Sequence, residues 1–186
     1  LLELSLIGGY RFGGPTDLLL QTGSLTGEGT MRRLAETQHW ATSLDSADSL
    51  RPGGEGWRVT VHVRVMHALV NARLADRWDV ARWGLPINMA DLAGTLGLFD
   101  GTVLLGCRAL GVPIPAADAH AYMHLWRYVG WLLGIHPDFL TEDEHERHRI
   151  NYHLLLAAAD VTPAGPALAR ATVAAQRTRR YAGWPG

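Results

Sequence analysis

Hydrophobic and polar positions repeat along most of this chain with the three-to-four-residue period of an α-helix. Residues 30–43 contain no Gly or Pro, and their apolar positions include Leu34 and Trp40. The other face of this segment carries Arg33 and Glu36, so the pattern is that of an amphipathic helix. Helices are predicted over residues 16–22, 30–43, 57–74, 101–110, 116–133 and 167–181, with one more opening at Asn88 or Asp91 and another at the capping box of residues 141–144.

The segment over residues 57–74 is ambiguous at its start. Residues 58–65 alternate polar and apolar with a period of two, which is typical of a half-buried strand. Residues 66–74 continue with helical periodicity and no breaker, and the whole run of about 18 residues exceeds ordinary strand length. We therefore predict one long helix.

The pattern as a whole predicts an all-α fold, a single-domain helical bundle of six to eight helices over residues 1–186. Residues 1–30 are expected to form a loop-rich entry, and residues 163–166, with two prolines, are expected to break the chain. A chain of this length buries roughly 70 % of the surface that it exposes when unfolded. Because the first residue is Leu1 and not Met, an N-terminal segment is expected to be missing.

Charge and composition exclude several functions. The formal net charge is −1 and no long basic run is present, so nucleic acid is not an expected partner. All 17 basic residues are Arg, which excludes Schiff-base and lysine-base chemistry, and the single Cys107 has no partner for an internal disulfide. No stretch approaches the roughly 20 uncharged apolar residues of a membrane span. We expect no stable membrane insertion and a cytoplasmic location in a bacterium, with export left open by the missing N-terminal segment.

One residue pair indicates a cofactor. Arg64 precedes His67 by one helical turn in an otherwise apolar run, so a cation and an imidazole share one helix face. A buried guanidinium needs an anionic partner, and a haem propionate would supply one while the imidazole binds iron. Arg33 and Thr37, four residues apart on the preceding helix, are candidates to line the same pocket. The alternatives are that His67 is a satisfied core histidine and that Arg33 pairs with Glu36 or faces solvent.

The other histidines carry weaker signals. His145 and His148 lie in a polar helix and are expected to face water, and the pair His120 and His124 lacks the Glu of a His-Glu-x-x-His site. The aromatic residues Trp126 and Trp131 are expected in the core, around an Arg127 paired with a carboxylate such as Asp79. No phosphate-binding loop, Ser-His-Asp order or Cys-His nucleophile pattern is present.

Several ordered blocks resemble a known family. They are residues 33–37 (Arg-Leu-Ala-Glu-Thr), 64–67 (Arg-Val-Met-His), 78–79 (Trp-Asp), 83–88 with 91–95, and 122–134. In this order they resemble the catalytic domain shared by rubber oxygenase (latex clearing protein) and the mpaB-type oxygenases. The resemblance covers roughly residues 10–140.

The resemblance implies an all-helical fold that holds a b-type haem between helices. It implies that His67 is the axial iron ligand and that Arg33, Thr37 and Arg64 line or support the haem pocket. Some rubber oxygenases carry a Lys in the Arg-to-Thr block that caps the iron, whereas this chain has Glu36 there. A lysine cap is therefore excluded, and Glu36 becomes a candidate distal base or hydrogen-bond acceptor.

The function predicted first is a haem b-dependent oxygenase that uses O₂ on a small apolar substrate. Its catalytic residues would be Glu36, Thr37 and Arg33, and its haem would be held by His67, Arg64, Arg33 and Thr37, with His67 on the iron. Rubber-cleaving members carry longer flanking segments, so cleavage of polyisoprene is not expected. Two alternatives stay open: a haem carrier or gas sensor without turnover, and a cofactor-free helical interaction domain.

Overall fold

The computed structural model of this protein describes residues 2–21, 29–46, 48–158 and 160–177, and within these ranges the chain forms helices and loops without a β-strand. The all-α prediction is therefore confirmed. The α-helices are α1 (Leu2–Gly9), α2 (Gly13–Gln21), α3 (Gly29–Ser43), α4 (Glu55–Leu74), α5 (Val80–Trp83), α6 (Met89–Phe99), α7 (Gly101–Ala109), α8 (Ala116–Leu133), α9 (Glu144–Ala157) and α10 (Ala164–Gln176), with the 3-10 helix η1 (Pro137–Phe139) before α9.

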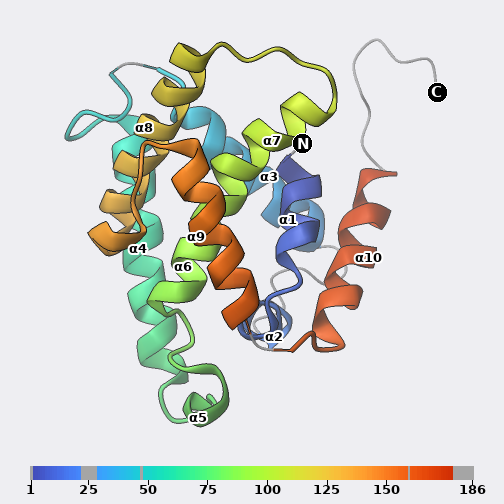
Figure 1. The fold of residues 1–186 in the computed structure, drawn as a ribbon. Helices are drawn as coiled ribbons and strands as arrows, with labels where there is room; N and C mark the ends of the chain where they lie inside the picture. The colour runs from blue at the N-terminus through green and yellow to red at the C-terminus, as the bar shows by residue number, and fades with distance from the viewer. Residues whose placement is uncertain (1, 22–28, 47, 159, 178–186) are drawn as a thin grey trace.

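Helix α6 occupies the centre of the molecule and packs against α1, α7, α8 and α9 (Figure 1). Small residues on α6 allow this close packing. Ala93 is fully buried, and Gly94 lies against the ring of Phe12. A Cβ atom at Gly97 would overlap the side chain of Asn151, so only glycine lets α9 approach α6 this closely.

Aromatic side chains join α6 to the helices on either side. The ring centroids of Trp40 on α3 and Phe99 on α6 are 5.3 Å apart, and Phe99 stacks on Trp126 of α8 at 5.2 Å. Trp40 also meets Trp126 edge to face at 5.7 Å. Contacts of this kind stabilise a core beyond the area that they bury. The three rings hold α3, α6 and α8 together although the backbones of α3 and α8 do not pack closely.

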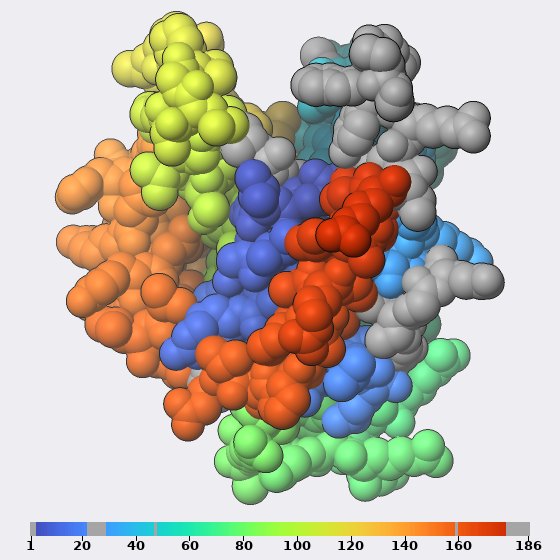
Figure 2. Space-filling view, turned by 90° about the vertical axis from the view of Figure 1, so that its right-hand side faces the viewer, coloured from blue at the N-terminus to red at the C-terminus, as the bar shows by residue number. Residues whose placement is uncertain are grey.

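The outer layer is formed by α4 on one side and α10 on the other. Helix α4 packs along α8 and contacts α3, and α10 packs on α2, α3 and α1 (Figure 1). Figure 2 shows α10 lying across the face formed by α1 and α2. The fully buried Leu168 and a 3.0 Å hydrogen bond between the hydroxyl groups of Tyr10 and Thr172 fix α10 in place.

Most predicted helices are confirmed, and the errors have local causes. The segment over residues 57–74 is one helix, and the predicted range 116–133 is that of α8. The described residues contain more helices than the six to eight expected, because α1 lies in the predicted loop-rich entry and α5 in a predicted turn.

The predicted starts of two helices, α9 and α10, were wrong. Residues 163–166 begin α10 and do not break the chain, because a proline in the first turn removes an N–H group that has no intrahelical partner. The end of the predicted range 167–181 lies outside the described residues. Helix α9 is capped by Asp143, whose carboxylate accepts a hydrogen bond from the Glu146 amide at 2.7 Å, whereas Thr141 donates to the Glu146 carboxylate.

A buried ion pair joins α9 to the junction between α6 and α7. Arg147 Nε lies 2.8 Å from Asp100 Oδ2, and both side chains are fully buried. Asp100 is also the N-cap of α7, because its Oδ1 accepts from the Gly101 amide at 2.5 Å. Burial raises the pKa of Asp100 to about 6, while the Arg147 charge acts in the opposite direction. The pair therefore couples the start of α7 to the packing of α9.

One helical run among the described residues, Met89–Ala109, has the length and apolar composition to cross a membrane, which the sequence analysis did not anticipate. Helices at the centre of a folded protein often meet the same criteria. Here 44 % of the most apolar window is buried inside the fold, and the run is interrupted at the ion-paired Asp100. The run therefore serves as the core of this fold.

We expect Asp100→Asn to lower the free energy of unfolding by about 3–5 kcal/mol, because it leaves the buried Arg147 charge without its partner. Arg147→Met should have an effect of similar size, and the double variant should lose less than the sum of the two. Arg149→Met, which removes an exposed pair with Glu146 on the same helix, is the matched control and should cost less than about 1 kcal/mol. Urea unfolding followed by circular dichroism measures all four proteins, and additive losses in the double variant would contradict the coupling.

Candidate functional site

Helices α3 and α4 form the frame of the candidate site and run antiparallel to each other. The indole N–H of Trp40 on α3 donates to the hydroxyl of the fully buried Thr60 on α4 at 3.0 Å. His39 on α3 lies 3.8 Å from Glu55 at the start of α4. Continuing this register brings the first half of α3 beside the second half of α4, where His67 lies.

His67 is partly buried, and its Nδ1 atom is buried without a hydrogen-bond partner in the described part of the chain. Burial lowers the pKa of His67, and the charge of Arg33 lowers it further. The imidazole is therefore neutral at neutral pH, which is the form that binds metal ions. The structure brings Arg33 and His67 within electrostatic range, as the sequence predicted. A hydrogen-bond partner for Nδ1, which a satisfied core histidine would have, is not present among the described residues.

Arg64 contacts the end of helix α8. Its Nη1 donates to the Leu132 carbonyl at 3.3 Å, and its guanidinium lies against Gly134, which ends α8 with φ of 86°. A cation at this position compensates the carbonyl groups that the last helical turn leaves unpaired. Arg64 is exposed, so the buried guanidinium on which the sequence analysis based its anionic partner is not found. No carboxylate pairs with Arg64 among the described residues, so its remaining N–H donors are available to an anion.

The residues of the Arg-to-Thr block lie along one stretch of α3. Arg33 is about half exposed and lies 3.6 Å from the Glu36 carboxylate, while Arg32 donates to the same carboxylate at 2.9 Å. The hydrogen bond from Arg32 and the two positive charges lower the pKa of Glu36, so it is ionised at neutral pH and a weaker base than a free Glu. The Thr37 hydroxyl donates to the Arg33 carbonyl at 3.0 Å.

A second polar cluster lies on α8, and the partner predicted from the sequence for its Arg127 was wrong. Arg127 pairs with Glu142 at 2.7 Å and not with Asp79, whose carboxylate caps α5. Glu142 is also 2.8 Å from His124 and 3.6 Å from His120. The spacing of four and three residues between His120, His124 and Arg127 indicates in the sequence that they share one helix face. The sequence does not indicate the acid that joins them, because Glu142 lies on the loop before α9.

The predicted core aromatics of α8 are divided between core and surface. Trp126 is buried at 3 % exposure, as expected, whereas Trp131 is 58 % exposed and stacks on Tyr128. The core prediction for Trp131 was therefore wrong. Residues 126 and 131 are five positions apart, so they cannot both lie on the same face of one helix.

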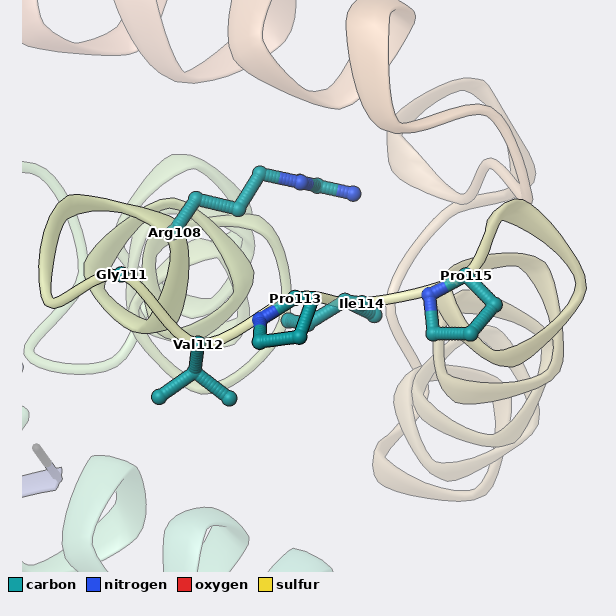
Figure 3. Close-up of a pocket in the computed structure, with 6 residues that line it drawn as sticks. All are labelled: Arg108, Gly111, Val112, Pro113, Ile114 and Pro115. Carbon is teal, nitrogen blue, oxygen red and sulfur yellow. The ribbon is translucent and has the colours of Figure 1, made fainter.

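Neither of the two pockets identified on the molecule contains His67. The first, of about 560 Å³, lies on the loop between α7 and α8 and is lined by Arg108 and residues 111–115 (Figure 3). The second, of about 510 Å³, lies between the end of α3 and the first half of α8. No group of three or more His, Cys, Asp or Glu side chains within the described ranges is arranged to hold a metal ion. A haem ligated by a single histidine does not need such a group.

Comparison with known proteins agrees with this architecture. Residues 8–185 match the family described as "ER-bound oxygenase mpaB/B'/Rubber oxygenase, catalytic domain". A rubber oxygenase from Streptomyces sp. (strain K30) is 26 % identical over 140 residues, which are 73 % of this chain and 34 % of the relative. The structure of latex clearing protein LCP in the closed state superposes with a TM-score of 0.66 and 22 % identity, covering 93 % of this chain and 46 % of that one.

The fold is all-helical, and the family match covers almost the whole chain. The chain belongs to the mpaB and rubber oxygenase catalytic-domain family. It spans about a third of the length of the curated relative and about half of the solved chain. The fold predicted from the resemblance is thereby confirmed, whereas the roles of Arg33, Glu36, Thr37, Arg64 and His67 stay predictions.

Gly134→Ala tests the contact between Arg64 and the end of α8. Gly53→Ala is the matched control, because Gly53 also has φ of 86° but a Cβ there meets nothing within 4 Å. Both variants should lose about 1–2 kcal/mol from the left-handed backbone. Gly134→Ala should lose roughly 0.5–1.5 kcal/mol more, because its Cβ would lie 3.0 Å from Arg64 Cζ and displace the hydrogen bond to Leu132. Thermal unfolding gives both values, and equal losses, or an excess that persists in an Arg64→Ala background, would contradict this assignment.

Asp91, in the family block that opens α6, should make stability depend on pH. Burial raises its pKa from 3.8 to about 6, although Asn88 donates to its carboxylate at 2.6 Å. A raised pKa means that its favourable contribution is present below about pH 4 and is lost as pH rises through about 6. Asp91→Asn should therefore gain stability relative to the parent protein between about pH 4.5 and 7.5. Melting temperatures of both proteins across this range provide the test, and a difference that does not change with pH would contradict the burial of this carboxyl.

Proposed function

We propose that this chain is the haem-binding core of an oxygenase that acts with O₂ on a small apolar substrate, and that His67 is its axial iron ligand. The observation that carries the proposal is the Nδ1 atom of His67, which is buried and unpartnered in a chain of an oxygenase family. Leaving such an atom without a partner costs about 1–3 kcal/mol. A bound group that uses the imidazole would offset this cost.

The chemistry of the donor set fits a haem. The imidazole of His67 is held neutral by burial and by the Arg33 charge, so its ring is ready to ligate iron without losing a proton. Arg64 and Arg33 are the cations available to the propionates, because neither is fully engaged by a buried carboxylate. Their side chains extend from α4 and α3, and the family resemblance implies a haem held between helices.

When bound, a b-type haem would supply the redox centre for O₂ chemistry. The protein's own residues would control what reaches it. The Thr37 hydroxyl keeps its oxygen lone pairs free because it acts as donor to the Arg33 carbonyl, and it is a candidate to accept a hydrogen bond. Glu36 would hold a proton only briefly at neutral pH, because Arg32 and Arg33 stabilise its anion.

Exposed apolar side chains are present on α4. Val65, Met66 and Leu69 are 52 %, 41 % and 45 % exposed, although each is a residue that normally favours the core. Val65 and Leu69 are each two positions from His67, about 160° around the helix, so they give α4 an apolar surface on the side opposite His67. The apolar character of the substrate therefore rests on the family resemblance.

One observation favours a second candidate, a helical module without cofactor. Arg64 has the Leu132 carbonyl as a partner and Arg33 has Glu36, so both cations are partly satisfied by the protein itself. The protein would then fold fully without haem and take up none. Haem uptake distinguishes this candidate from the oxygenase, and O₂ consumption with a reductant distinguishes the oxygenase from a carrier or sensor.

Reconstitution with haem tests the ligand assignment. We expect the parent protein and His62→Ala, an exposed histidine of the same helix, to bind haem with the same Soret band. His67→Gly should lose or shift this band because the axial nitrogen is gone, and added imidazole should restore it. Identical spectra for His67→Gly and the parent protein would exclude His67 as the ligand, and no haem uptake by the parent protein would remove the oxygenase proposal.

A further inference from the structure

A groove of about 510 Å³ lies between the end of α3 and the first half of α8, away from His67. Its lining positions on α8 follow helical spacing, beginning at Asp118 and continuing through Tyr122, Leu125 and Trp126. On the other side, Asp45 lies just past the last turn of α3. The groove exists because the aromatic contact of Trp40 with Trp126 joins the two helices while their backbones stay apart.

The inner part of the groove is aromatic and firmly held. Trp126 is only 3 % exposed and stacks on Phe99. The hydroxyl of Tyr122 donates to the Phe99 carbonyl at 2.6 Å, and its ring meets Trp126 edge to face at 6.2 Å. An apolar ligand entering the groove would therefore meet a surface that needs no rearrangement, which lowers the cost of binding.

The outer part of the groove is negatively charged. Asp45 lies in the bend after α3 and Asp118 in the first turn of α8, and neither forms an ion pair with any residue in the described part of the chain. No Arg is among the residues that line this groove. Two uncompensated carboxylates above aromatic rings attract a positive charge attached to an apolar body, because carboxylates and ring faces both favour a cation.

This groove is separate from the proposed haem site. Its first lining residue, Ala41, follows Arg33 by eight positions on α3, which corresponds to about 12 Å along a helix. The groove residues include none of the residues assigned to haem. Binding here can therefore be measured on the protein without haem, and the result does not depend on the proposed function.

We propose that this groove binds an organic monocation, an ammonium group carried on a small aromatic or aliphatic body. The ammonium would lie between Asp45 and Asp118, and the apolar body would pack against Leu125 and the rings of Tyr122 and Trp126. A purely structural account assigns Asp118 to the first turn of α8, where a carboxylate favours the helix dipole, and leaves Asp45 in water. That account gives no selectivity for a cation.

Isothermal titration calorimetry on the full chain distinguishes the two accounts. The probes are phenethylamine, which is protonated at about pH 7.5, and phenethyl alcohol, which has the same body without charge. The parent protein should bind the amine about tenfold more tightly than the alcohol at low ionic strength. The variant Asp45→Asn/Asp118→Asn should lose that preference, because each exposed carboxylate contributes a few-fold at most. Asp76→Asn, an exposed aspartate at the end of α4, is the control and should bind both probes as the parent does.

Two-dimensional NMR of the indole N–H signals identifies the location. The amine should shift the Trp126 signal in the parent protein, assigned by its loss in Trp126→Phe, and should leave it unchanged in the double Asp variant. Equal affinity for amine and alcohol, an amine affinity unchanged by the double substitution, or no binding of the amine at all would each overturn the proposal. The double variant retains the core rings, and its circular dichroism spectrum confirms that it folds.

Discussion

The fold depends on one buried electrostatic contact, the ion pair of Asp100 and Arg147. The carboxylate lies where α6 ends and α7 begins, and the guanidinium reaches it from α9. Water has no access to either group, so each charge is tolerable only in the presence of the other. This requirement fixes the position of α9 against the central helix. The close approach of Asn151 to Gly97, one turn further along α9, depends on the same placement.

The central helix in turn determines where the outer helices lie. Phe99 at the end of α6 supports Trp126 and Trp40, and through them the relative positions of α8 and α3. Helix α4 is then held by Trp40 at Thr60 and by Arg64 at the end of α8. His67 lies one turn beyond Arg64, and one turn further along α4 the side chain of Asn71 is hydrogen-bonded to the backbone of Ile87. The position of His67 is therefore set by contacts on both sides of it along the same helix.

The same arrangement explains why two different polar regions occur along α3. Near its start, Arg33 provides positive charge beside His67, which adds to the effect of burial in lowering the histidine pKa and favours anionic groups. Near its end, Asp45 and Asp118 provide negative charge beside aromatic rings. Since α8 carries both the carbonyl that holds Arg64 and the rings of the groove, both regions depend on the position of α8, and each favours a ligand whose charge is opposite to its own.

The sequence by itself determined the helical class, most helix positions and the candidate ligand. Periodicity was sufficient for α4 and α8 because both are long and because Pro115 and Gly134 mark the ends of α8. The spacing of Arg64 and His67 and the order of the family blocks were enough to identify the family. These features are local, so they can be recognised without knowing which segments are neighbours in the fold.

Only the tertiary structure decided which groups are partners. Arg127 pairs with Glu142 and not with Asp79, and Arg64 donates to a carbonyl group on another helix. Arg147 lies in a highly charged helix but is fully buried. Nothing in the sequence distinguishes Arg147 from Arg149, since both lie in the same polar helix. The difference arises because burial and charge pairing depend on distances between segments that are far apart along the chain, and these distances exist only once α6 is surrounded by its neighbours.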